Sequence, residues 1–444
     1  MKILIAGHGD TAIHLAKMLS REKQDVVVMG TDSAVLSELD AHYNVITTVG
    51  SAVSRDALVA AGAGSCDLFI AVTPFENHNL ISCEIAKWLG AATTLARIDN
   101  AELLKDDLCE HFRSLGVDRM VYPEYLASKE ICDTLAHSAY RSIHSIAGGL
   151  LEVMSLKLPA DAPIAGISLA EFGRRTSNFH ISMIKRRGEV IIPQGGTMLE
   201  RGDVVYVTST PGHEEELAQL FGKTDRAIGQ VIVAGAGKIA AMLARNYSRA
   251  DRLKFIDPDR ERCLKLSAKA PEATIVCADF RDIDVLREEG IRESAAFVAL
   301  GDSSETNIVA AIMARDAGAL KTVAQIEDIQ YFDEAQSLDI DTVVNKKLLT
   351  SSHIYQLLLD SYLDSPRCLA FEDTEVVEIV ASERSHITSR RIRDLHLSRD
   401  MTIAGLTRGD SGMLVGGDTR IEPGDHVVVF CQRGTLKKVE RLFV

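Results

Sequence analysis

The stretch that decides the fold opens the chain: Lys2-Ile-Leu-Ile-Ala-Gly7-His-Gly9-Asp-Thr-Ala12. A short apolar run leads into a G-x-G-x-x-A turn, and a helical pattern follows directly. The stretch recurs 228 residues later as Gln230-Val-Ile-Val-Ala-Gly235-Ala-Gly237-Lys-Ile-Ala240. At the same spacing, the segment 70–79 corresponds to the segment 298–307. A repeat over this distance predicts two copies of one domain.

Both copies alternate short apolar runs with amphipathic helical segments, as doubly wound α/β domains do. Runs this short and rich in Val and Ile suit parallel strands that are buried on both faces. The expected strands are 3–6, 26–29, 45–49, 68–72 and 93–98 in the first copy and 231–234, 253–256, 274–277, 296–300 and 321–326 in the second. The predicted fold class is therefore α/β, with two Rossmann-like doubly wound parallel sheets.

A different pattern follows each copy, in residues 150–221 and 374–444. Both segments contain short strands, glycine turns and a terminal helix, and Leu199-Glu-Arg-Gly202-Asp203 resembles Ile421-Glu-Pro-Gly424-Asp425. Each Rossmann sheet is thus expected to be followed by a small α+β domain. The expected domains are 1–140, 141–222, 229–364 and 365–444, with breaks near 222–229 and at Ser365-Pro366.

Charge and composition exclude several classes of protein. The formal charge of −14 argues against a nucleic-acid partner, because that affinity depends on Lys and Arg side chains that neutralise phosphates. The basic cluster of 174–175 and 185–187 is interpreted as a solvated face. No signal-peptide pattern and no long apolar stretch occur, so a cytoplasmic location is expected. The eight scattered cysteines form no C-x-x-C pair, and no metal site is expected.

The glycine turns predict a site for a nucleotide pyrophosphate. In this motif the first glycine permits a tight turn, the second lets phosphate approach the backbone, and the third small residue lets the helix pack on the strand. Backbone N–H groups and the positive end of the helix then face the phosphate. The candidate binding residues are Gly7, Gly9, Asp10 and Thr11 in the first copy and Gly235, Gly237, Lys238 and Ile239 in the second.

The two copies differ where the second and third strands end. Asp257, 20 residues after Gly237, is the acidic residue expected to bind the ribose hydroxyls. In the first copy Gly30 occupies this place, and Asp32 lies two residues beyond. After the third strand, Asp279 is suited to accept from the adenine amine, whereas the first copy has Ser51. The second site is therefore expected to be better formed for an adenine nucleotide, and the first to be weakened, altered in specificity or silent.

Further candidates follow the fourth and fifth strands. The segments 73–79 and 301–307 lie at the carboxyl ends of parallel strands, where ligands of such sheets bind. Thr73 and Glu305 are the candidates there, and helix N-capping is the alternative role for these segments. Arg97, at the end of the fifth strand, is placed to reach a phosphate or a carboxylate of another domain, and Gln325 replaces it in the second copy.

Taken together, these residues resemble the TrkA family of regulatory subunits of Trk potassium uptake, whose repeated units are called RCK or KTN domains. Both glycine turns, Ile256-Asp257, Glu305-Thr-Asn307 and the closing stretch 420–430 account for the resemblance. It implies binding of NAD(H), and of ATP or ADP, in the Rossmann domains. It also implies a homo-oligomer, a dimer or tetramer ring, docked on a membrane-embedded potassium-translocating subunit of the TrkH or TrkG type. Gly30, Ser51 and Asn77 depart from the family pattern.

Two other functions are alternatives to this one. An NAD-dependent dehydrogenase would need a catalytic domain with a general acid or base, whereas the segments between the Rossmann copies are short and repeated. No nucleophile elbow or P-loop occurs either, so no enzymatic activity is expected. A nucleotide-sensing regulator of another cation transporter stays open, because the surfaces that choose a partner have no recognisable sequence pattern. The expected function is a cytoplasmic, membrane-peripheral regulatory subunit of potassium uptake.

Overall fold

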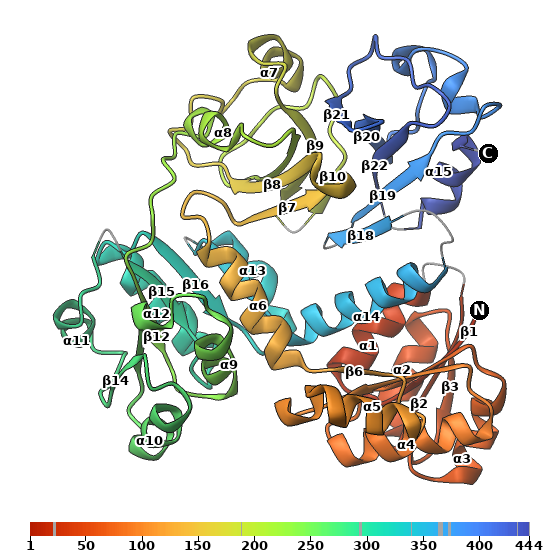
Figure 1. The fold of residues 1–444 in the computed structure, drawn as a ribbon, viewed down its shortest axis with the longest axis vertical. Helices are drawn as coiled ribbons and strands as arrows, with labels where there is room; N and C mark the ends of the chain where they lie inside the picture. The colour runs from red at the N-terminus through yellow and green to blue at the C-terminus, as the bar shows by residue number, and fades with distance from the viewer. Residues whose placement is uncertain are drawn as a thin grey trace. The chain divides into compact units, whose positions relative to one another are not determined.

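The computed structural model describes residues 1–20, 24–187, 189–292, 295–338, 340–362, 367–371, 374–432 and 434–443 (Figure 1). The chain forms two compact units. The first comprises Met1–Ala127 and Asn345–Leu358, and the second comprises Ser128–Val344 and Leu359–Val444. The predicted break at Ser365-Pro366 lies outside the described residues, and the four-domain division by residue number stays a prediction.

The first unit contains the first Rossmann sheet. Its described strands are all parallel in the order β3-β2-β1-β4-β5-β6, with helices α1–α5 between them. The strands are β1 (Lys2–Ala6), β2 (Asp25–Gly30), β3 (Ile46–Val49), β4 (Leu68–Ala71), β5 (Thr93–Arg97) and β6 (Arg119–Val121). The helices are α1 (Asp10–Ser20), α2 (Ser33–His42), α3 (Arg55–Ala60), α4 (Glu76–Leu89) and α5 (Asp106–Ser114). Strand order reverses between β1 and β4, and ligands of such sheets bind at that point.

The second unit contains the second Rossmann sheet, with the equivalent order β14-β13-β12-β15-β16-β17. Its strands are β12 (Gln230–Ala234), β13 (Leu253–Ile256), β14 (Thr274–Val276), β15 (Ala295–Ala299), β16 (Lys321–Gln325) and β17 (Thr342–Val344). The helices are α9 (Lys238–Asn246), α10 (Arg260–Lys269), α11 (Ile283–Glu288), α12 (Ser304–Asp316) and α13 (Phe332–Ser337). The predicted fold class of two doubly wound parallel sheets is confirmed.

Two long helices follow the last strands of the sheets. They are α6 (Pro123–Leu135) after β6 and α14 (Lys346–Tyr362) after β17. Residues 345–358, which include most of α14, belong to the first unit although β17 belongs to the second. The chain therefore delivers a segment of the second copy to the first Rossmann domain.

The sequence pattern missed the sixth strand of each sheet, β6 and β17. Each is only three residues long, which is too short for an apolar run to stand out from its surroundings. Central strands were easier to predict because they are apolar along their whole length. All described residues of β4, β15 and β16 are buried, as expected for strands of a parallel sheet that is covered on both faces.

Two antiparallel sheets form the small α+β domains, as the sequence predicted. Their orders, β10-β9-β11-β8-β7 and β18-β19-β22-β20-β21, are the same once the repeat is aligned. The first contains β7 (Ser142–Ile146), β8 (Leu151–Lys157), β9 (His180–Arg186), β10 (Glu189–Ile191) and β11 (Val204–Ser209), with α7 (Leu169–Arg175) and α8 (Glu214–Leu220). The second contains β18 (Arg367–Phe371), β19 (Thr374–Val380), β20 (Met401–Arg408), β21 (Ser411–Leu414) and β22 (His426–Gln432), with α15 (Leu436–Phe443).

A duplicated ion pair explains the Gly-Asp motif of the small domains. Arg186 binds Asp203 through two nitrogens, at 2.8 Å each, and Arg408 binds Asp425 in the same way at the same distances. Both aspartates are 1% exposed. Arg186 belongs to the basic cluster of the sequence analysis. Because its guanidinium binds Asp203, its role is to stabilise its own small domain. Among the described helices, none is both long and apolar enough to cross a membrane.

Candidate functional site

The first glycine of each turn is required by the backbone. Gly7 has φ +144° and Gly235 has φ +113°, which side chains rarely adopt. A Cβ at Gly235 would lie 2.6 Å from the carbonyl oxygen of Leu300, and one at Gly7 would lie 2.9 Å from that of Val72. At each of these positions only glycine lets the turn pass close to the end of the neighbouring strand, β4 or β15. The fold itself therefore requires both glycines.

The second glycine of each turn has no such structural requirement. A Cβ at Gly9 or at Gly237 would meet nothing within 4 Å, and Gly237 has an ordinary extended backbone with φ −80°. The open space beside both residues is where a phosphate would approach the backbone. Ala12 and Ala240 are fully buried, consistent with close packing of helix on strand. The turns thus have the geometry that the phosphate motif needs.

Asp257 supports the second turn from the end of β13. One oxygen of its carboxylate accepts from the backbone N–H of Ala236 at 2.7 Å, and the other accepts from that of Asp259 at 2.8 Å. The residue is 3% exposed. A carboxylate oxygen can accept more than one hydrogen bond, so these two contacts leave acceptor capacity for a ribose hydroxyl. Asp257 therefore holds the turn in place, and its contact with a ribose stays a prediction.

The first turn is built differently at the same place. Gly30 ends β2, and a Cβ there would lie 2.6 Å from Nδ1 and 2.8 Å from Cβ of His8. His8 stands where the second copy has Ala236. The imidazole therefore occupies the space that the carboxylate of Asp257 takes in the second copy. Sequence reasoning noted the missing acid at Gly30 but missed this role of His8, although the mismatch of His8 with Ala236 was visible in the repeat.

Asp32 and Asp279 both have partners within their own domains. Asp32 is the N-cap of α2, and its carboxylate accepts from the backbone N–H groups of Ala34 and Val35 at 2.9 and 3.3 Å. Asp279 accepts from Arg281 at 2.6 and 2.9 Å, and this hydrogen-bonded ion pair lowers the pKa of its carboxyl. Ser51 lies in the matching loop, where its carbonyl accepts from the backbone N–H of Ser54 at 3.0 Å. Ligand contacts for all three residues stay predictions.

Two buried asparagines for which the sequence predicts no specific role join the ends of neighbouring strands. Asn79 accepts from the N–H of Thr73 at 2.9 Å and donates to the carbonyls of Thr73 and Arg97 at 3.0 and 2.9 Å. Asn307 makes the equivalent contacts with Gly301 and Gln325 at 2.8 to 2.9 Å. Both asparagines are 1% exposed. Their recurrence at the repeat spacing was the signal that could have identified them.

In the second copy, the segment 301–307 has the alternative role of helix N-capping. The hydroxyl of Ser303 accepts from the N–H of Thr306 at 3.1 Å and caps α12. Glu305 is exposed and accepts from the same hydroxyl at 2.8 Å. Two hydrogen bonds lower the pKa of the Glu305 carboxyl: the larger effect comes from its own backbone N–H, and the smaller from the hydroxyl of Ser303. Its carboxylate is therefore ionised and exposed to solvent, and a ligand contact there stays a prediction.

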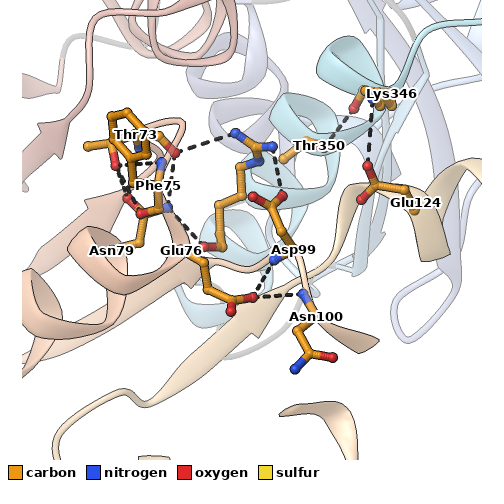
Figure 2. A network of polar contacts seen from close by, with 10 residues as sticks. Thr73, Phe75, Glu76, Asn79, Asp99, Asn100, Glu124, Lys346 and Thr350 are labelled. Atoms are coloured by element: carbon orange, nitrogen blue, oxygen red, sulfur yellow. Dashed lines mark hydrogen bonds and ion pairs between the residues drawn. The ribbon is translucent and has the colours of Figure 1, made fainter. Parts of the chain in front are cut away.

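Arg97 contacts a polar network at the ends of β4 and β5, of which Figure 2 labels Thr73, Glu76 and Asp99. Its guanidinium binds Asp99 at 2.9 Å and donates to the carbonyl of Thr73 at 3.4 Å. The carboxylate of Glu76 accepts from the backbone N–H groups of Asp99 and Asn100 at 2.6 and 2.7 Å. The described partners of Arg97 thus lie in its own domain, and its phosphate role stays a prediction.

The first helical residues after the turns carry opposite charges. Asp10 begins α1 and forms an ion pair with Lys347 of α14 at 2.6 Å. The hydroxyl of Ser351 donates to the carbonyl of Thr11 at 3.3 Å. Lys238 begins α9 and is exposed. The side chain of Ile239 is 5% exposed, so its backbone N–H is the group suited to meet a ligand.

The fold and the paired glycine turns define a duplicated protein of the Rossmann class. The TrkA-N domain matches residues 3–123 and 231–346, and the TrkA-C domain matches residues 153–222 and 376–444. The chain therefore belongs to the TrkA family, with both domains present twice.

Curated relatives extend over the whole chain. A Trk system potassium uptake protein TrkA homolog from Archaeoglobus fulgidus is 29% identical, with both chains covered completely. The Trk system potassium uptake protein TrkA of Haemophilus influenzae is 28% identical and covers the whole chain with 98% of its own length.

Solved structures share the fold at lower identity. The crystal structure of the GsuK RCK domain has a TM-score of 0.60 and 18% identity over the whole chain and 94% of its own length. The GsuK channel bound to NAD has a TM-score of 0.60 and 18% identity, with 100% of this chain and 78% of its own covered.

Proposed function

We propose that this protein is a nucleotide-binding regulatory subunit of a Trk-type potassium uptake system, with NAD(H), ATP or ADP as its ligands. The names of its relatives support the transport system, and the NAD-bound and ADP-bound GsuK structures support the class of ligand. It acts in the cytoplasm, on the inner face of the membrane. It forms a homo-oligomer docked on a membrane-embedded potassium-translocating subunit of the TrkH or TrkG type.

The observation that supports nucleotide binding most directly is the open space at Gly9 and Gly237. Neither the backbone conformation of Gly237 nor any neighbouring atom within 4 Å of either position requires a glycine there. A ligand that must approach the backbone closely supplies the missing reason. The N–H groups of the turns and the first turns of α1 and α9 would hold its phosphates.

The two sites are proposed to differ in affinity and specificity. In the second, Asp257 would accept from the ribose hydroxyls, and Asp279 and Glu305 would contribute further acceptors at the edge of the site. In the first, His8 fills the place of that acid, so Ser51, Thr73, Asp32 and Arg97 are the available polar groups. The second site is the one expected to be filled at lower nucleotide concentration.

Regulation would work through a shift between two arrangements of the oligomer. Nucleotide favours one arrangement only to the extent that it binds that arrangement more tightly than the other. Because the segments between the two Rossmann copies are short and repeated, the ligand is proposed to be bound and not consumed.

Calorimetry of the purified full chain with NADH, NAD, ATP and ADP tests the proposal. Binding to the wild-type protein is expected, with affinity lowered at least about tenfold at the second site by Gly237→Ala. Because a Cβ at Gly237 meets nothing within 4 Å, this variant should keep the melting temperature of the wild type. Gly235→Ala is the contrasting control and should be destabilised. A wild-type chain that binds none of the four nucleotides would overturn the proposal.

Transport and partner are tested in cells. A strain that lacks this chain should take up potassium more slowly, and Gly237→Ala should alter the uptake that the wild-type chain restores. The tagged chain should co-purify with a potassium-translocating membrane subunit. Recovery of a different cation transporter, or sustained oxidation of NADH with a carbonyl substrate, would assign another function.

A further inference from the structure

The first glycine turn has an electrostatic conflict. Helix α1 begins with Asp10, so a carboxylate stands at the helix end that is proposed to face phosphate. A negative charge there is favourable for the empty helix, because it interacts with the positive end of the helix. The same charge repels an anionic ligand. A nucleotide phosphate can bind tightly only if the charge of Asp10 is compensated.

The compensation comes from a distant part of the sequence. Lys347 of α14, 337 residues away, places its ammonium 2.6 Å from the carboxylate of Asp10. Ser351, one helical turn further along α14, donates to the carbonyl of Thr11 at 3.3 Å. Two side chains of α14 thus contact the first two residues of α1, within the same compact unit.

The start of α14 is held in place by neighbours of Lys347. The amide oxygen of Asn345 accepts from the backbone N–H groups of Lys347 and Leu348 at 2.9 and 3.1 Å, and Asn345 is 2% exposed. Lys346 lies 3.6 Å from the carboxylate of Glu124, which is 4% exposed, and Figure 2 shows this pair. The Lys347 side chain is 29% exposed. It therefore extends from a fixed backbone, unlike a lysine of an open surface.

The second turn has no such conflict. There the first helical residue is Lys238, so the cation belongs to the turn's own helix. The repeat has thus exchanged the sign of the charge at this position. A cation from the second copy of the repeat restores the balance at the first turn.

We propose that Lys347 is a residue of the first nucleotide site and that it sets the affinity of this site for nucleotide phosphate by neutralising Asp10. The inference rests on the proposed function and specifies its regulation. The two interactions strengthen each other by the same factor. A nucleotide at the first turn therefore also strengthens the contact between α14 and α1. Nucleotide binding at the first site is then coupled to the position of α14, the helix that precedes the last small domain in the chain.

Calorimetry on full-length variants tests this, with Gly237→Ala as the background so that the first site dominates. ADP and adenosine are the probes, because only ADP has phosphates. Lys347→Ala should weaken ADP about tenfold and leave adenosine unchanged, and Asp10→Asn should tighten ADP several-fold. Lys347→Arg should retain the affinity of its parent. Lys265→Ala, which removes an exposed 2.6 Å pair with Glu261, is the matched control and should change neither ligand.

The outcomes separate the two proposals. If the wild-type chain binds ADP and Lys347→Ala binds it as tightly as its parent, the inference on Lys347 fails and the proposed function stands. If Lys347→Ala weakens adenosine and ADP equally, the lysine has only a structural role and the inference also fails. If Lys347→Ala does not fold, Asp10→Asn still decides, because unchanged ADP affinity in that variant contradicts a charge conflict at this turn. If the wild-type chain binds no adenine nucleotide, the proposed function itself fails.

Discussion

The two glycine turns are the same in backbone and different in chemistry. Gly7 and Gly235 make the same close approach to the neighbouring strand, and Asn79 and Asn307 make the same three hydrogen bonds. At the end of the second strand, however, the His8 ring faces Gly30 in one copy, and Asp257 binds the N–H of Ala236 in the other.

This difference shows which parts of a duplicated domain were free to change. Residues that the sheet needs in order to fold are the same in both copies, because any replacement would clash or leave a buried polar group unpaired. Gly9 and Gly237, which would meet the phosphates, are also shared, whereas the residues around them that would face the rest of a ligand diverged, since the fold tolerates either solution. The copies are therefore expected to be equal in stability at shared contacts and unequal in affinity.

The largest effect is expected at a contact that the small domains share. Arg186→Ala and Arg408→Ala each leave a buried aspartate with its backbone partner but without its guanidinium, and because both arginines are partly exposed we expect each change to lower the free energy of unfolding by about 2–3 kcal/mol. Urea denaturation measures this. Arg391→Ala is the control, because its pair with Asp418 is exposed and should contribute less than about 1 kcal/mol. A clear difference between Arg186→Ala and Arg408→Ala would contradict the equality of the small domains.

The same ion pair predicts a dependence on pH. Burial opposes ionisation of Asp425, but the hydrogen bonds from Arg408 and from the backbone N–H of Glu422 outweigh it and lower the pKa of the carboxyl. A carboxyl with a lowered folded-state pKa stabilises the protein above its unfolded pKa of about 3.9 and loses that contribution as the pH falls further. Stability measured from pH 6 down to pH 3 should therefore fall less steeply in Arg408→Ala than in the wild type.

The next effect concerns the acid of the second turn. Asp257→Ala removes the proposed ribose acceptor and the partner of the Ala236 N–H, and should weaken ADP or NADH at this site about 10- to 100-fold. The matched control is Asp259→Ala, two residues along, which removes the N-cap of α10 at a cost of about 1 kcal/mol. Its nucleotide affinity should stay that of the wild type. Equal affinities in Asp257→Ala and Asp259→Ala would show that the second turn does not depend on its acid.

The smallest effect is a gain at the first turn. Gly30→Asp alone should be destabilising, because its Cβ would lie 2.6 Å from the His8 ring. His8→Ala with Gly30→Asp rebuilds the arrangement of the second copy and should raise nucleotide affinity at the first turn several-fold, by about 1 kcal/mol. Calorimetry in the Gly237→Ala background measures the change. A double variant that folds and gains no affinity would mean that the copies differ by more than this pair.

Much of the fold could be predicted because its patterns are local. The Val- and Ile-rich runs of β1, β4, β12 and β15 are read over a few residues, and the turns that follow them require glycine for backbone reasons. The candidate site was predictable to the same extent, as a set of positions near the switch point. The three-residue strands β6 and β17 were missed, because so short a segment has no period of its own.

The sequence by itself determined the duplication, the two Rossmann sheets, the small domains after them and the positions of the glycine turns. Only the tertiary structure decided that His8 fills the place of an acid, that Asp257 binds the turn it follows, and that Lys347 reaches Asp10 across 337 residues. The physical reason is range. Periodicity and backbone strain act between neighbours in the chain, whereas charge and packing act between neighbours in space, which only the folded path brings together.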